Sequence, residues 1–479
     1  MTRLESGFET LNTLSVVEQA EAVARGDTTS VALTEAALAA FELHNPSINA
    51  AIWLQADAAL EAAGALDAMQ RAGRPLGPLH GVPMVHKDMY YQAGKPCTCG
   101  SSIRKDFVPD YTATVIERLH AAGSLTVGGL NMAEFAQNPT GHNAHFGDCH
   151  NPWHLDYCTG GSSSGSGAAV AARCVGASLG SDTGGSIRLP AALCGVTGIK
   201  GTQTRVSRYG VMPLSFSADN VGPLARTARD CARIMTVISG HDPKDPTSST
   251  EPVPDYEAAL TGNVKGLRIG IPTNYFFDDI DTEVNAAFDE AMAVLVARGA
   301  VLVPVTLPLM ADISAYGGIV SRCEGAAIHA QWMREAPQDY AVHLSARLYG
   351  GSAIPAVMYL EGLNRRGAIL QSFTAEVFGA CDVFAAPALR TKAPTLHETN
   401  IDGGVEGAIE AFMNVSVNTR PANYLGLPSA SMPCGFDSNG LPIGALIHGR
   451  PFAEGRVLQV ADAYQCDTDW HLRVPSHLA

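Results

Sequence analysis

Apolar segments of two lengths alternate along most of the chain, and this alternation constrains the fold more than any other feature. Short runs of the length of buried strands are followed by alanine-rich or amphipathic stretches of helical length. The strand-length runs lie at 82–85, 124–127, 267–271, 301–305, 383–386 and 443–447, and the helical stretches at 114–122, 165–172 and 283–297. This order is typical of an α/β fold, and we expect a central mixed, largely parallel β-sheet flanked by helices.

The first 75 residues differ from this pattern because they are mainly helical in character. Ser15 and Glu18 have the spacing of a capping box before a helix rich in Ala and Val that ends at Gly26. Further elements are expected at 30–44, 48–54 and 57–72, the middle one a strand. We therefore divide the chain into an N-terminal helical region, 1–75, and a larger domain, 76–479, in which the proline-rich stretch near 241–254 is a surface loop.

Composition and charge exclude several classes of protein. Hydrophobic residues make up 46% and charged residues 16% of the 479-residue chain, which is the range of folded globular proteins. The net charge of −15 argues against a general surface for nucleic acids or anionic membranes. The sequence shows no secretory signal and no apolar run of membrane-spanning length. We expect a soluble protein in the cytoplasm, and a homodimer is one assembly that the sequence allows.

The eleven cysteines do not form a metal-binding pattern. Only Cys97 and Cys99 are close together, and no second pair of Cys or His follows at the spacing of a zinc site. An odd number of cysteines in a chain of this size favours reduced thiols over a disulfide framework. We expect no metal and no cofactor.

Two segments rich in glycine and serine, 159–167 and 180–188, are the candidate functional sites. Flexible linkers explain them poorly, because apolar stretches flank both segments and tie them to the core. Phosphate-binding loops explain them poorly too, because the motifs G-x-x-x-x-G-K-[ST] and G-x-G-x-x-G are missing. The third explanation is acyl transfer, in which a serine beside consecutive glycines attacks a carbonyl carbon while backbone N–H groups stabilise the oxyanion.

A serine nucleophile needs a base, since the hydroxyl alone is a poor nucleophile. The G-x-S-x-G turn of α/β-hydrolases does not fit around Ser186, which weakens a Ser-His-Asp arrangement despite fifteen histidines. A lysine is the remaining option.

Five motifs in order along the chain closely resemble the amidase signature family. They are GVPMVHKD at 81–88, GGSS at 160–163, GSDTGGSIRLP at 180–190, PANYLGLP at 421–428 and GLPIG at 440–444. The resemblance therefore spans most of the chain. It implies the fold of that family and its Ser-cisSer-Lys triad, with Ser186 as the nucleophile, Ser162 as the bridging serine and Lys87 as the base. It also implies a cis peptide bond between Gly161 and Ser162.

The resemblance further suggests an oxyanion hole and a substrate pocket. The stretch 134–141 is expected to line the acyl pocket, with Ala136 and Gln137 as substrate-binding residues. Arg420 either recognises a substrate carboxylate or belongs to a structural ion pair. The expected oxyanion hole consists of backbone N–H groups around Ser186, those of Thr183, Gly184 and Gly185.

The function implied is hydrolysis of the C–N bond of a small amide-type substrate through an acyl-enzyme intermediate. Carboxamides, aryl amides, carbamates and hydrazides all fit, with no nucleic acid and no membrane as partner. The alternative is a glutaminase-type A subunit of a tRNA-dependent amidotransferase, for which 205–210 is the closest matching stretch. We disfavour this alternative because 315–350 lacks the tyrosine- and arginine-rich pattern associated with such glutaminases. A catalytically silent binding protein is a third class, which the intact triad argues against.

Overall fold

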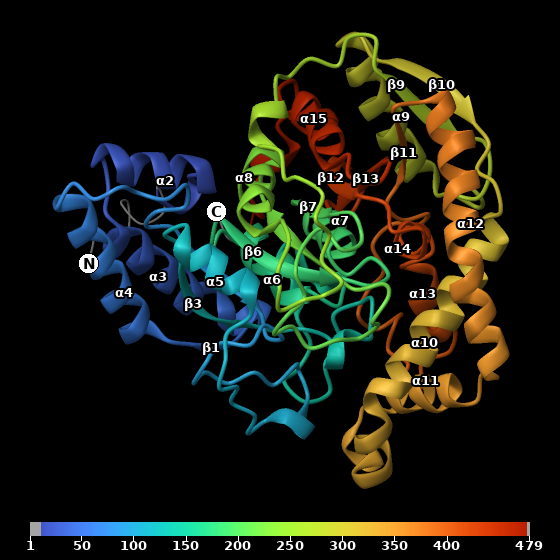
Figure 1. Ribbon diagram of the computed structural model, residues 1–479, viewed down its shortest axis with the longest axis horizontal. Helices are drawn as coiled ribbons and strands as arrows, with labels where there is room; N and C mark the ends of the chain where they lie inside the picture. The colour runs from blue at the N-terminus through green and yellow to red at the C-terminus, as the bar shows by residue number, and fades with distance from the viewer. Residues whose placement is uncertain (1–10, 477–479) are drawn as a thin grey trace.

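A mixed sheet of eight strands runs through the centre of the molecule in the computed structural model, which describes residues 11–476 (Figure 1). The strand order is β10-β9-β11-β13-β12-β7-β8-β6. The strands are β6 (Ala177–Asp182), β7 (Thr197–Lys200), β8 (Asn220–Ala225), β9 (Arg268–Pro272), β10 (Val301–Val305), β11 (Val383–Pro387), β12 (Ser429–Phe436) and β13 (Pro442–Gly449). The predicted α/β class with a mixed sheet flanked by helices is confirmed, but the expectation that this sheet is largely parallel is wrong, because only two of its seven neighbouring pairs in the described residues are parallel.

The parallel pairs of this sheet are confined to one side, where β10 and β11 flank β9. From β11 to β6 every neighbouring pair in the described residues is antiparallel. The connections explain the difference between the two sides. Helix α9 (Thr282–Ala297) carries the chain between the parallel strands β9 and β10, whereas β12 and β13 are joined by a short turn that only an antiparallel pair can use.

Helices cover both faces of the sheet. On β13, a side chain at Gly444 would meet Ala192 of α7 (Arg188–Cys194), whereas one at Gly449 would meet Val457 of α15 (Glu454–Gln465). These two glycines are an odd number of residues apart, so they face opposite sides and place α7 and α15 on opposite faces. Helix α8 (Ala228–Ile238) and α9 pack beside α15, and α6 (Ser164–Ala171) packs beside α7.

A second, smaller sheet has the strand order β1-β3-β2, with β1 (Ala51–Leu54), β2 (Pro83–Lys87) and β3 (Leu125–Leu130). Helices α3 (Ser30–Ile48) and α4 (Ala56–Arg71) pack on this sheet, whereas α2 (Val16–Arg25) and α5 (Thr114–Ala121) pack against α8. The predicted capping box of Ser15 and Glu18 is confirmed, and Gly26 ends α2 in the left-handed conformation. Residues 1–10 of the predicted N-terminal region and 477–479 lie outside the described part.

One boundary differs from the sequence prediction. Helix α3 continues to Ile48, past the expected end at 44, and strand β1 begins at Ala51 instead of 48. Asn49 ends the helix in the left-handed conformation, and its N–H donates to the carbonyl of Asn45. Asparagine tolerates that conformation better than most side chains, so it acts here as the stop signal.

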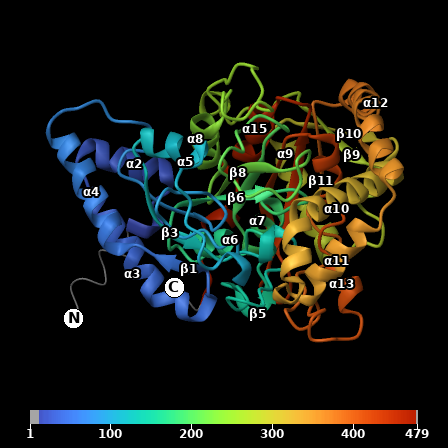
Figure 2. The ribbon, with the colours of Figure 1, turned by 60° about the horizontal axis from the view of Figure 1, so that its bottom comes forward.

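A group of long helices forms the opposite end of the molecule. Helices α10 (Met310–Glu335), α11 (Val342–Ser352) and α12 (Ala356–Ala380) pack on one another beside the short helices α13 (Ala408–Asn414) and α14 (Pro421–Leu425). Figures 1 and 2 both place this group and the N-terminal helices at opposite ends, with α6, α7 and β6 between them.

A short hairpin, β4 (His150–Asn151) and β5 (His154–Cys158), completes the strands of the described residues. None of the helices in residues 11–476 combines the length and apolarity needed to span a membrane.

Candidate active site

Lys87 lies at the end of strand β2, where the smaller sheet packs against β6 of the larger one. Its side chain is 1% exposed. The ammonium nitrogen donates to Ser162 Oγ at 2.7 Å and to Ser181 Oγ at 2.8 Å. Burial lowers the pKa of Lys87 to about 7, although the nearby carboxylates of Asp182 and Asp219 act in the opposite direction. A substantial fraction of this lysine is therefore neutral near pH 7 and able to accept a proton.

Ser162 is fully buried and follows a cis peptide bond from Gly161, as the family resemblance implied. Neighbouring backbone fixes this turn, because Gly161 N–H donates to the carbonyl of Pro139 at 2.7 Å and Ala133 N–H donates to the carbonyl of Ser162 at 3.1 Å. A Cβ atom at position 161 would lie 2.5 Å from the carbonyl oxygen of Asn138. Only glycine fits there, so the turn that presents Ser162 to Lys87 depends on this residue.

Ser186 stands in the loop between β6 and α7, which a buried ion pair holds in place. Asp182 and Arg188 are both fully buried, and the guanidinium of Arg188 donates to both carboxylate oxygens of Asp182 at 2.9 and 3.0 Å. Asp182 also accepts from the backbone N–H groups of Gly185 and Ile187. Burial alone would raise the pKa of Asp182, but Arg188 beside it holds the value at about 2. The ion pair thus fixes the backbone on both sides of Ser186.

Breaking this ion pair is expected to destabilise the fold. Asp182→Asn leaves Arg188 buried without its counter-charge, which lowers the free energy of unfolding by about 3–5 kcal/mol. The pKa of Asp182 in the folded state, about 2, lies below its ordinary value of 3.8. The contribution of the ion pair to stability is therefore fully present above pH 3.8 and is lost as the pH falls through 2. Urea unfolding at pH 7 measures the change. Glu361→Gln, which removes the exposed partner of Arg365, is the control and shifts stability by less than about 1 kcal/mol.

The backbone N–H groups around Ser186 are not all available to a substrate. Gly185 N–H donates to Asp182 Oδ1 at 2.8 Å, so this predicted oxyanion donor is already committed within the protein. Within residues 11–476, the N–H groups of Thr183, Gly184 and Ser186 donate to no protein acceptor. Thr183, Gly184 and Ser186 also line a pocket, whereas Gly185 does not. The three residues whose backbone N–H groups are free, Thr183, Gly184 and Ser186, are therefore also the three that line the pocket.

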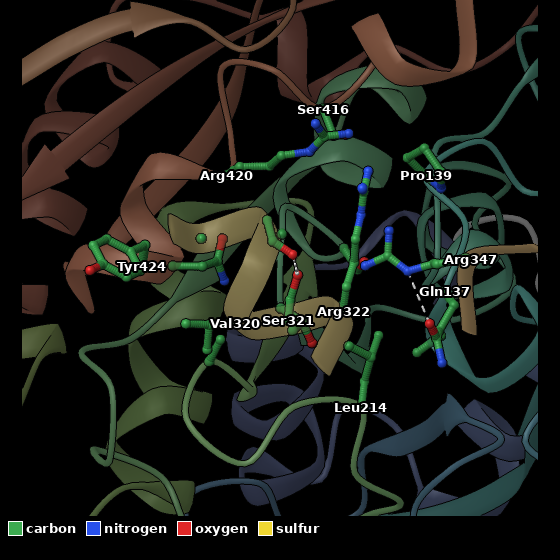
Figure 3. Close-up of a pocket in the computed structure, with 18 of the residues that line it drawn as sticks. Gln137, Pro139, Leu214, Val320, Ser321, Arg322, Arg347, Ser416, Arg420 and Tyr424 are labelled. Atoms are coloured by element: carbon green, nitrogen blue, oxygen red, sulfur yellow. Dashed lines mark hydrogen bonds between the residues drawn. The ribbon is translucent and has the colours of Figure 1, made fainter. Parts of the chain in front are cut away.

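The pocket has a volume of about 120 Å³ and opens beside the partly exposed Ser186 (Figure 3). All three predicted substrate-binding residues, Ala136, Gln137 and Arg420, line it. Helices α10, α11 and α12 close the far side and contribute residues that sequence reasoning missed. The most polar of these are Arg322, Arg347 and Arg366.

These arginines correct one argument made from the sequence. The lack of a tyrosine- and arginine-rich pattern in 315–350 argued against the glutaminase-type alternative, yet Arg322 and Arg347 of this region line the pocket. No local sequence signal points to these arginines, because the helices that carry them converge on Ser186 only through tertiary packing.

Comparison with known proteins agrees with this geometry. A family model described as Amidase matches residues 32–458. The chain belongs to the amidase signature family. The resemblance inferred from the five motifs is thereby confirmed, and the chain is a hydrolase of C–N bonds at the level of that family.

Individual relatives carry several different names. The A subunit of the glutamyl-tRNA(Gln) amidotransferase of Chloroflexus aggregans (strain MD-66 / DSM 9485) is 41% identical, over 97% of this chain and 98% of the relative. Among solved structures, one from a vestigial protein complex bearing on the origins of an s-triazine catabolic enzyme is 33% identical with a TM-score of 0.89, covering 95% of this chain and 98% of the other. A bacterial aryl acylamidase is 27% identical with a TM-score of 0.88, covering 98% and 99%.

Proposed function

We propose that this chain hydrolyses the C–N bond of a small amide-type substrate, with Ser186 as nucleophile, Ser162 as proton relay and Lys87 as base. The observation that carries the proposal is the 2.7 Å contact between Lys87 Nζ and Ser162 Oγ, made by a buried lysine with a pKa of about 7. A lysine in that state can accept a proton at neutral pH, which an ordinary solvated lysine cannot do.

The proposed reaction has two halves. Ser186 Oγ attacks the carbonyl carbon while its proton passes through Ser162 to neutral Lys87, and the backbone N–H groups of Thr183, Gly184 and Ser186 stabilise the oxyanion. The proton then returns through Ser162 to the departing amine, which leaves an acyl-enzyme on Ser186. Water attacks the acyl-enzyme in the second half and releases a carboxylic acid. The scheme uses no metal and no cofactor, and we place it in the cytoplasm.

A second candidate is the glutaminase-type A subunit of a tRNA-dependent amidotransferase. The name of the relative that is 41% identical over nearly the whole chain favours it. In that case glutamine is the amide substrate, and the released ammonia passes to a partner chain that acts on tRNA. The expectation of a small-molecule substrate without nucleic acid then holds only for the half-reaction on this chain.

A substrate panel separates the two candidates. The purified chain is offered an aryl amide, an aliphatic carboxamide, a carbamate, a hydrazide and glutamine, and release of amine or ammonia is measured with Ser186→Ala as the blank. We expect turnover of at least one of the first four by the chain alone. Glutaminase activity that appears only when a partner chain is added would decide for the amidotransferase instead.

Metal removal gives a further expected result. The proposed chemistry has no Lewis acid, so prolonged treatment with a chelator leaves kcat/KM of the best panel substrate unchanged. Loss of activity on chelation, restored by adding back a divalent metal ion, would contradict the scheme.

A further inference from the structure

Resting on the proposed function, we infer that the pocket beside Ser186 selects amides that carry a carboxylate and no ammonium group. The selecting residues are Arg322 of α10, Arg347 of α11, Arg420 at the start of α14 and Gln137. These four residues come from three parts of the chain that are far apart in sequence. Figure 3 shows the guanidinium groups of the three arginines turned toward the same part of the pocket.

Positive charge in this pocket is not compensated by the protein. Four arginines line it, and no aspartate or glutamate does. Arg322, Arg347 and Arg420 form no ion pair with any residue of the described chain. The charges that act on Arg347 are instead those of Arg322 and Arg420, and burial together with these neighbours lowers the pKa of Arg347 to about 10. Burial also lowers the pKa of Arg420, whereas Arg322 is exposed. A bound anion would relieve the repulsion among the three guanidinium groups and the desolvation of Arg347 and Arg420.

The fourth arginine shows what a structural role looks like in the same pocket. Arg366 donates to the carbonyls of Ser217 at 2.6 Å and Asn423 at 3.2 Å, and the negative charge of Glu324 acts on it. Glu324 itself is buried and does not line the pocket. Arg366 thus makes two hydrogen bonds to backbone carbonyls and has a carboxylate near it, which is why it is left out of the selecting group. Arg420 makes one such bond, to the carbonyl of Met413 at 3.3 Å.

Gln137 orients the guanidinium group of Arg347. Its Oε1 accepts from Arg347 Nε at 3.0 Å. Because arginine can only donate, this contact fixes which end of the Gln137 amide faces Arg347. The other end, Nε2, is buried in a side chain that is 6% exposed and has no hydrogen-bond partner in the described structure. A buried donor without an acceptor is costly, but a substrate in the pocket does not reach this nitrogen, so Gln137 acts on a substrate through the orientation of Arg347.

The same features disfavour an amino acid such as glutamine. Its α-carboxylate suits the arginines, but its α-ammonium would enter a pocket lined by four cations and by no carboxylate. Like charges at short range in a partly desolvated site repel strongly. Glutaramate, which is glutamine without the ammonium group, keeps the carboxylate and the amide and loses only the repelled charge.

Binding to the inactive Ser186→Ala chain tests the inference separately from the reaction. Calorimetry compares two matched pairs, glutaramate with glutamine and succinamate with asparagine, and uses butyramide as the neutral amide. We expect the better of the two anionic amides to bind roughly 30-fold or more tightly than its amino acid and than butyramide. Binding of the amino acids that equals or exceeds that of the anionic amides, or no preference of any anionic amide over butyramide, overturns the inference.

Variants in the Ser186→Ala background identify the residues responsible. Arg347→Met and Arg420→Met should each weaken binding of the anionic amide by roughly 10-fold or more, whereas Arg334→Met, on the exposed side of α10, should not. Gln137→Glu places a carboxylate beside Arg347. This variant should therefore weaken binding of the anionic amide and reduce the ratio between its affinity and that of the amino acid. Thermal unfolding midpoints check that each variant is folded. If the folded arginine variants bind the anionic amide as tightly as the parent Ser186→Ala chain, these arginines do not select the carboxylate.

The two proposals fail in different ways. Selective binding of the anionic amide without turnover by the wild-type chain leaves the pocket assignment intact and overturns the hydrolase scheme. Turnover of neutral aryl or aliphatic amides only, with no preference for an anionic one, leaves the hydrolase scheme intact and overturns the pocket assignment.

Discussion

Replacing Ser186 by alanine is expected to lower kcat by roughly 10,000-fold or more on every substrate that the chain hydrolyses. Ser186 supplies the only proposed nucleophile, and its side chain makes no hydrogen bond within residues 11–476, so the substitution leaves the loop contacts unchanged. The ion pair of Asp182 with Arg188 continues to hold the backbone N–H groups in place. Loss of activity would therefore report loss of the nucleophile and not of the loop.

Covalent trapping gives an independent measurement of the same residue. A fluorophosphonate should add one adduct mass to the wild-type chain on the peptide that contains Ser186, and none to Ser186→Ala. Ser178→Ala is the matched control, because Ser178 lies on the strand leading to the loop and its hydroxyl bonds only to Ser166 and to a backbone carbonyl. A folded Ser186→Ala protein that still forms the fluorophosphonate adduct and keeps wild-type turnover would falsify the assignment of Ser186 as the nucleophile.

The elements around the triad could be predicted from the sequence because each has a local signal. The strand-length apolar run at 82–85 became β2, and the helical stretch after Ser163 became α6. Lys87 follows the first, and Ser162 precedes the second. Spacing along the chain therefore brings these residues to the ends of packed elements, and the motif resemblance supplied their pairing.

The substrate pocket could not be predicted in the same way, because its arginines have no local signal. The alternation of apolar segments gives no element between 306 and 382, where α10, α11 and α12 lie. Helix α10 contains Gly317 and Gly318, which lower its helix propensity. Arg322 and Arg347 come near Arg420 only because α10 packs against both α11 and α14.

The proposed oxyanion donors illustrate a second limit of sequence reasoning. Thr183, Gly184 and Gly185 are equivalent in the motif, since each precedes the nucleophile and each has a backbone N–H. The structure separates them, because the Asp182 carboxylate accepts from Gly185 and not from the other two. Which backbone donors remain free is a property of the folded loop.

Replacing Lys87 by arginine is expected to lower kcat/KM by roughly 1,000-fold or more, even though the positive charge is kept. Arginine cannot release its proton in this role, so it cannot accept one from Ser162. In the proposed scheme, activity of the wild type requires neutral Lys87. Because burial lowers its pKa to about 7, kcat/KM should fall as the pH drops through 7 and should level off above it. The measurement is kcat/KM from about pH 5 to 10.

A second buried lysine makes a control necessary. Burial and the charge of Arg188 also lower the pKa of Lys200 to about 7, so an acidic limb near that pH has two possible sources. The contacts separate them, because Lys200 donates to the carbonyl of Gly201 at 2.8 Å whereas Lys87 donates to Ser162 and Ser181. Lys200→Met should keep the limb at its wild-type position. Substantial activity in Lys87→Arg would contradict the role of Lys87 as the base. Loss of the acidic limb in Lys200→Met would show that the limb reports the titration of Lys200 instead of Lys87.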